Sequence, residues 1–133
     1  MASPPTIRLG ELRVTVDDPG AWVESDRWNL RYVHLDYLVQ RGPEDSALRV
    51  VVVEYAPGAE VLPHSHPVDY VSVVVKGSMR VTRRQHEVGS IRLVKAGTTY
   101  GPLEVGPEGC TVIDVFGPGD AAMTLAERAA PVE

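Results

Sequence analysis

Hydrophobic and polar positions alternate along this chain over short stretches, which glycine and proline interrupt. Alternation with a period of two, in stretches rich in β-branched residues, is typical of strands with one buried face. Short strands at even spacing predict an all-β sandwich or barrel. The expected strands are Ile7 to Val16, Trp28 to Gln40, Leu48 to Tyr55, Tyr70 to Val75, Ser78 to Thr82, Ser90 to Val94 and Cys110 to Phe116.

Residues that favour turns separate the expected strands, since glycine accepts positive φ and proline fixes φ near the value that many turns need. After the last turn, Asp120 to Arg128 has two interpretations. It is either a short C-terminal helix that Asp120 caps or an edge strand. The expected turns are Gly42 to Asp45, Ala56 to Gly58, Lys76 to Gly77, Val88 to Gly89, Ala96 to Gly97, Gly106 to Gly109 and Gly117 to Gly119.

A chain of 133 residues with a net charge of -5 and no biased segment is expected to form one globular domain over residues 1–133. Cys110 is the only cysteine, which excludes an intramolecular disulfide and agrees with the reducing cytoplasm. The apolar stretches are too short to span a bilayer, so we expect no membrane partner. The acidic charge balance likewise argues against a nucleic-acid partner.

The stretch that is most informative about chemistry contains two histidines and reads GAEVLPHSHPVDYVSVVVKG. His64 and His66 are two residues apart, so on a strand their side chains point to the same face. Histidine is the commonest metal ligand and the side chain best suited to proton transfer near neutral pH. The pair therefore predicts a chemical site, with or without a metal.

These positions resemble the cupin family, whose small jelly-roll barrels carry two glycine-bounded motifs. The resemblance covers roughly the middle half of the chain, with motif one at residues 58–77 and motif two at residues 89–104. It implies a single-domain cupin-type jelly-roll β-barrel that forms a homodimer. The matching positions are Gly58, His64, His66 and Gly77 in motif one and Gly89 and Gly97 in motif two.

The chain departs from the family where cupins hold their other metal ligands. Tyr70 stands at the place of the usual glutamate and Tyr100 at the place of the third histidine. Phenols with a reference pKa of about 10 bind divalent ions poorly, because ligands must be deprotonated. Two interpretations stay open. Either His64 and His66 hold one divalent metal (Fe, Zn, Mn or Ni), with Asp69 or a tyrosine completing the set of ligands, or the site holds none.

Alternation along the strand that begins at Tyr70 argues against the metal interpretation. It places the side chain of Asp69 on the face opposite to that of Tyr70, unless the preceding turn redirects it. If the family register holds, Tyr70 and Tyr100 enter the same cavity as His64 and His66. Such a cluster combines proton donors and acceptors, which general acid/base catalysis requires. The structural alternative is that these side chains only pack and satisfy one another.

Further along the N-terminal half, Tyr32, His34 and Asp36 share one face of an expected strand. We assign this face to solvent or a subunit contact in preference to the cavity. The absence of an arginine cluster disfavours a phosphorylated ligand, with Arg49 and Arg92 left open.

The favoured function is an enzyme that uses acid/base chemistry on a small organic substrate, by isomerisation, cyclisation or elimination. His64 or His66 would be the base, and Tyr70 or Tyr100 would donate a hydrogen bond to a developing oxyanion. An apolar cavity with a few polar groups suits a small organic molecule. One alternative is a non-catalytic module that binds or senses a small ligand. The second is a non-haem iron dioxygenase that uses His64, His66 and Asp69.

Overall fold

The computed structural model describes residues 22–34, 48–118 and 124–125. The expected strand at Ile7 to Val16 and the expected turn at Gly42 to Asp45 lie outside these residues. The described part consists of strands and connections, and it holds no helix that could cross a membrane. The strands are β1 Val23–Glu24, β2 Leu30–His34, β3 Arg49–Tyr55, β4 Glu60–Val61, β5 His64–Ser65, β6 Tyr70–Val81, β7 Arg84–Glu87, β8 Ile91–Val94, β9 Leu103–Phe116 and β10 Thr124–Leu125.

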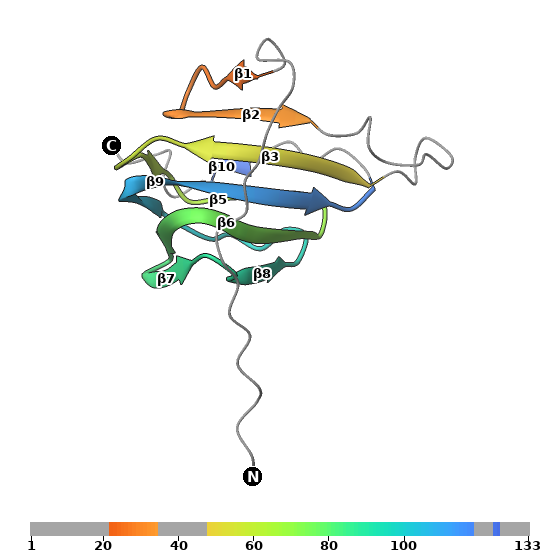
Figure 1. The fold of residues 1–133 in the computed structure, drawn as a ribbon. Coiled ribbons are helices and arrows are strands. Elements are labelled where there is room, and N and C mark those ends of the chain that lie inside the picture. Colours follow the sequence, from red (N-terminus) through yellow and green to blue (C-terminus); the bar gives the residue numbers. More distant parts are fainter. Residues whose placement is uncertain (1–21, 35–47, 119–123, 126–133) are drawn as a thin grey trace, which may run out of the picture.

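Eight of these strands form one antiparallel sheet, in which the order β1-β2-β3-β9-β6-β7 can be followed across Figure 1. β4 also pairs with β9, and β8 also pairs with β6. β5 and β10 form a separate two-stranded sheet. This arrangement confirms the predicted all-β, cupin-like fold. The short strand that carries His64 therefore lies outside the main sheet, where it can face the sheet across an interior space.

The long strands β6 and β9 correct two predicted turns. Lys76 to Gly77 and Gly106 to Gly109 were expected to end strands, but each lies inside one continuous strand. The pairing of β6 with β9 contains two register shifts, next to Lys76 and next to Gly77, which absorb the extra residues as irregularities. Both strands therefore continue through these irregularities, which bend the pair locally.

Gly77 shows why glycine is needed at this bend. Its φ is +74°, a conformation that other residues adopt only with strain. A Cβ at this position would overlap the carbonyl oxygen of Gly109 on the neighbouring strand. The glycine thus permits a close approach between β6 and β9.

The predicted C-terminal helix over Asp120 to Arg128 is wrong at Thr124–Leu125, which form β10. β10 pairs antiparallel with β5, with Leu125 opposite His64. Helix propensity is a weak preference that tertiary pairing overrides, and here the backbone of the His64 strand provides the partner. The alternative interpretation, an edge strand, is confirmed at these two residues, and the rest of the range lies outside the described residues.

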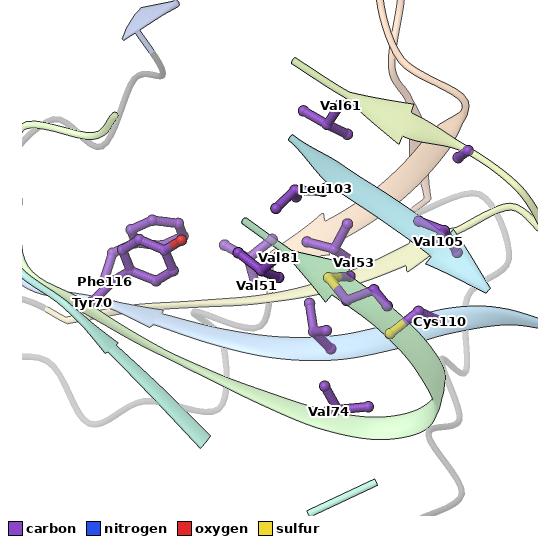
Figure 2. Close-up of a cluster of buried hydrophobic side chains, with 13 residues drawn as sticks. Val51, Val53, Val61, Tyr70, Val74, Val81, Leu103, Val105, Cys110 and Phe116 are labelled. Carbon is purple, nitrogen blue, oxygen red and sulfur yellow. The ribbon is translucent and has the colours of Figure 1, made fainter. Parts of the chain in front are cut away.

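The hydrophobic core has an aliphatic part and an aromatic part. Figure 2 shows the rings of Tyr70 and Phe116 together at one end of the cluster, apart from the aliphatic side chains. Their ring centroids lie 4.8 Å apart in a stacked arrangement. Cys110 is buried in the aliphatic part, and burial raises the pKa of its thiol to about 12. The aromatic end leads into the candidate site.

Candidate functional site

A cavity of about 420 Å³ opens beside the aromatic end of the core. Strands of the main sheet form one wall, and β5 with the Tyr100 segment contributes to the other. Its ring side chains are Trp28, Tyr32, Tyr55, His64, His66, Tyr70, Tyr100 and Phe116. Its charged side chains are Arg49, Arg92 and Asp114, and the remaining residues are Ser25, Leu30, Val51, Val53 and Val61.

His64 is fixed in the cavity wall by its backbone and by its ring. Its backbone N–H and carbonyl pair with the carbonyl and N–H of Tyr100, both at 3.0 Å. Ring atom Nδ1 lies 2.8 Å from the carbonyl oxygen of Leu62, which can only accept, so Nδ1 carries a proton and donates it. Burial lowers the pKa of His64, which keeps the imidazole neutral and leaves Nε2 as an acceptor.

Two phenols extend this arrangement into a chain of hydrogen bonds. The hydroxyl of Tyr100 lies 3.0 Å from Nε2 of His64 and donates to it, and the hydroxyl of Tyr70 donates to that of Tyr100. Burial raises the pKa of Tyr70 to about 12 and raises the pKa of Tyr100 well above its usual range. Both phenols therefore stay protonated near neutral pH. We call Tyr70, Tyr100 and His64 the relay, because each donates toward the next.

His66 completes the predicted four-residue cluster. Its ring centroid lies 5.2 Å from that of His64 and 5.3 Å from that of Tyr70, both in edge-on arrangements. It also contacts Phe116 at a centroid distance of 5.2 Å. The structure thus brings His64, His66, Tyr70 and Tyr100 into one cavity, while their catalytic roles stay predictions.

Asp69 does not join this cluster, so the predicted His64, His66 and Asp69 metal triad does not match the structure. Its exposed carboxylate accepts hydrogen bonds from Nζ of Lys95 and from the backbone N–H of Ala96, both at 2.8 Å. These bonds, that from Lys95 first, hold the pKa of Asp69 below its usual value. The pattern of alternating faces had indicated this outcome.

The remaining donors do not suit a divalent metal. Across residues 22–34, 48–118 and 124–125, no group of three His, Cys, Asp or Glu side chains is placed to hold a metal ion. Around His64 and His66 the nearest oxygen donors in the cluster are two phenols whose pKa values are raised, and neutral phenols are poor ligands. Nε2 of His64 is also occupied by the Tyr100 hydroxyl. The metal of typical cupins therefore does not fit this cavity.

Asp114 is a functional candidate that sequence reasoning missed. It lies on β9, is only 8% exposed, and lines the cavity. Among the described residues its Oδ1 has no hydrogen-bond partner. Burial raises the pKa of Asp114 to about 6, although a hydrogen bond with Ser72 and the charge of Arg92 act in the opposite direction. A signal was present, since a carboxylate interrupts the apolar face that Val112 and Phe116 share on a predicted strand.

Arg92 connects the carboxylate with the relay. In the register of the sheet, Arg92 pairs with Ser72 and Ser72 pairs with Asp114, so the three lie in one row across β8, β6 and β9. The Arg92 guanidinium lies 5.3 Å from the centroid of the Tyr100 ring. Its positive charge lowers the pKa of Tyr70, Tyr100 and Asp114 against the larger effect of burial.

One face assignment from the sequence is also corrected. Tyr32 on β2 lines the cavity, whereas we had assigned its face to solvent or a subunit contact. Its register partner Val53 belongs to the core cluster, which explains the inward orientation. The side chain of His34 and all of Asp36 lie outside the described part of the chain.

Comparison with known proteins gives structural matches only. No protein-family model and no curated protein matches the sequence. KdgF from Halomonas sp. is 24% identical, with a TM-score of 0.61 over 79% of this chain and 94% of that chain. An RmlC-like cupin from Shewanella frigidimarina is 23% identical, with a TM-score of 0.60 over 84% and 96% of the two chains. An acetylacetone dioxygenase from Acinetobacter johnsonii is 13% identical, with a TM-score of 0.64 over 100% and 90%. These matches establish the fold and leave the reaction open.

Proposed function

Because the chain has the cupin fold, we propose that it is an enzyme that moves a proton on a small organic substrate in this cavity, using its own side chains. The relay carries this proposal. Its acceptor, Nε2 of His64, is buried behind the hydroxyl of Tyr100. A proton can therefore reach the imidazole through the phenol.

The first half of the reaction removes a proton from the substrate. The proton passes to the oxygen of Tyr100 while the Tyr100 proton passes to Nε2 of His64, so the phenol stays neutral and the imidazole becomes positive. The carbonyl oxygen of Leu62 stabilises this imidazolium, because it already accepts the hydrogen bond from Nδ1. The raised pKa keeps Tyr100 protonated, so no phenolate is available as the base, and His64 is the proton acceptor of the pair.

The electron pair left on the substrate needs a stabilising donor. When it is delocalised onto an oxygen, the hydroxyl of Tyr70 can turn from Tyr100 to that oxygen, and the charge of Arg92 stabilises it further. Return of the proton at another carbon completes an isomerisation. In an elimination, a leaving group departs and the proton held by His64 passes back through Tyr100 to it. In a cyclisation, the substrate carbon attacks a second carbonyl of the same molecule, and the oxygen of that carbonyl takes up the proton.

Hydrogen exchange tests this proposal without knowledge of the natural substrate. The protein is incubated in deuterium oxide with small carbonyl compounds, and deuterium uptake at the carbon next to the carbonyl is followed by NMR. Tyr100→Phe and His64→Gln are expected to slow exchange by a factor on the order of 10² to 10⁴. His86→Gln is the matched control, because His86 lies on β7, bonds to Ser90 and does not line the cavity. Equal exchange by wild type and Tyr100→Phe would contradict the proposal.

The same experiment separates the other candidate functions. A compound that raises the melting temperature without any exchange would favour a non-catalytic binding module. We do not propose a non-haem iron dioxygenase, because Asp69 is held by Lys95 and the phenols are poor metal ligands. Homodimerisation, cytoplasmic location and the absence of a nucleic-acid partner stay predictions.

A further inference from the structure

The cavity contains a polar group that the relay does not use. Asp114 is buried and lines the cavity, and Oδ1 of its carboxylate has no hydrogen-bond partner in the described part of the chain. Buried polar atoms are nearly always paired, and an exception at a cavity indicates a partner supplied from outside. A carboxylate oxygen can only accept, so that partner must be a donor.

The charged neighbours decide which kind of donor fits. Arg49 and Arg92 also line the cavity, so the charged groups in its described wall are two guanidiniums and one carboxylate. The phenols and His64 are neutral, because burial shifts their pKa values away from the charged forms. The resulting excess of positive charge disfavours an ammonium donor and favours an anionic ligand. A hydroxyl is then the donor that suits Oδ1.

We infer that the cavity takes a small organic anion that also bears a hydroxyl group, with the hydroxyl donating to Asp114 and the anionic group lying toward Arg92. The inference rests on the proposed function, because it assigns a substrate class to the same cavity. The row of Arg92, Ser72 and Asp114 across three adjacent strands places the two contacts on one wall of the cavity. The relay stands beside this row, because Tyr70 is two residues before Ser72 on β6 and so shares its face. A carbon between the two groups of such a ligand would lie within reach of the relay.

Three matched probes test the two contacts separately. Mandelate carries a ring, a carboxylate and a hydroxyl, phenylacetate lacks the hydroxyl, and mandelamide lacks the charge. Their affinities are measured by isothermal titration calorimetry. Wild type is expected to bind the better enantiomer of mandelate about tenfold more tightly than phenylacetate. A hydrogen bond to a charged group contributes at least about this factor to affinity.

Substitutions then assign each contact to its residue. In Asp114→Ala the preference for mandelate over phenylacetate is expected to fall to near one, while phenylacetate binds no more weakly than to wild type, because a negative charge has left the cavity. Asp114→Asn keeps the size of the side chain, and we expect an intermediate preference. Arg92→Gln is expected to weaken both anions about tenfold and to leave mandelamide unchanged. Thermal unfolding confirms that each variant is folded.

Several outcomes would overturn the inference. These are equal binding of mandelate and phenylacetate by wild type, an unchanged preference in Asp114→Ala, equal binding of mandelate and mandelamide, and no binding of either anion in the millimolar range. Failure of the proposed function is distinguishable. Tyr100→Phe is expected to keep the preference for the hydroxyl and to lose exchange, so the binding ratio and the exchange rate report on different residues.

Discussion

Tyr100 and His64 are joined twice, once through side chains and once through backbones. The phenol donates to Nε2 across 3.0 Å, and two backbone hydrogen bonds of 3.0 Å link the same residues as an isolated antiparallel bridge. The backbone bridge fixes the register of the two segments. The phenol is therefore aligned with the imidazole before any ligand arrives, which is the preorganisation that catalysis requires.

The first prediction compares the two phenols of the relay. Tyr100→Phe leaves Nε2 of His64 buried without its donor, so we expect the free energy of unfolding to fall by about 1 to 3 kcal/mol. Tyr70→Phe leaves the Tyr100–His64 bond intact, and we expect a smaller loss. Urea unfolding of both variants measures the difference. A larger loss for Tyr70→Phe would show that the relay is not ordered as described.

A second prediction concerns the proton on His64. Because Nδ1 donates to Leu62, the neutral ring should be the Nδ1–H tautomer near pH 7. Burial lowers its pKa below the ordinary value of 6.5, so it should still be neutral where an exposed histidine is partly protonated. Nitrogen-15 chemical shifts of the ring report both properties. A proton on Nε2 at neutral pH would refute this assignment.

The third prediction links Asp114 to the pH dependence of stability. Its pKa is about 6 in the folded protein, against an ordinary value of 3.8. Between these pH values the folded protein binds the proton more tightly than the unfolded chain, so raising the pH through this range destabilises the fold. At pH 7 the cost is about 3 kcal/mol relative to acidic conditions.

Asp114→Asn removes this titration and measures the cost. Relative to wild type, the variant should gain stability as the pH rises from about 4 to about 7. Urea unfolding of both proteins across this range gives the comparison. Taking the difference between the two proteins cancels the other carboxylates, including Asp69. Parallel stability curves would mean that the carboxyl group at Asp114 does not titrate as stated.

The fourth prediction uses two glycines that share a conformation but differ in surroundings. Gly77 and Gly97 have φ values of +74° and +78°, yet only at Gly77 would a Cβ overlap a backbone atom, the carbonyl oxygen of Gly109. Gly97→Ala should cost about 1 to 2 kcal/mol from the left-handed conformation alone. Gly77→Ala should cost at least about 3 kcal/mol or prevent folding. Similar melting temperatures for the two variants would contradict the close approach of β6 and β9.

The last prediction concerns metal. Wild type should not retain stoichiometric iron, zinc, manganese or nickel, because its phenols are poor ligands. The variant carrying Tyr70→Glu and Tyr100→His supplies a carboxylate and a third imidazole, and it should gain metal that elemental analysis detects. Adding His64→Ala and His66→Ala should abolish the gain. Stoichiometric metal in wild type that is lost in Asp69→Ala would restore the triad interpretation.

The alternation of hydrophobic and polar residues and the turn residues predicted those strands and turns that depend on residues close in sequence. The alternation from Leu48 to Tyr55 matches β3 to within one residue, and the turns at Ala56 to Gly58 and at Val88 to Gly89 lie between strands. His64 and His66 could be assigned to a site because their spacing depends only on strand geometry. Tyr70 and Tyr100 needed the family resemblance in addition, since their approach depends on distant segments.

The remaining features depend on contacts that no local pattern encodes. Lys76 to Gly77 has the composition of a turn, yet β9 pairs with this segment and strand β6 continues through it. Thr124–Leu125 lie in a stretch with helical composition, yet β5 offers them a backbone partner. Asp114 was placed on a strand correctly, but whether its carboxylate faced a cavity or solvent depended on how β9 was positioned in the sheet.

The pairing of β10 with β5 also has a consequence for biosynthesis. His64 is flanked by the Tyr100 segment on one side and by Leu125 on the other, and both follow it in the chain. The N-terminal end of a nascent chain leaves the ribosome first, so His64 emerges well before either neighbour. The main sheet can form once β9 has emerged, while β5 still has an open edge. The surroundings of the histidine are therefore completed late, after most of the scaffold that supports them.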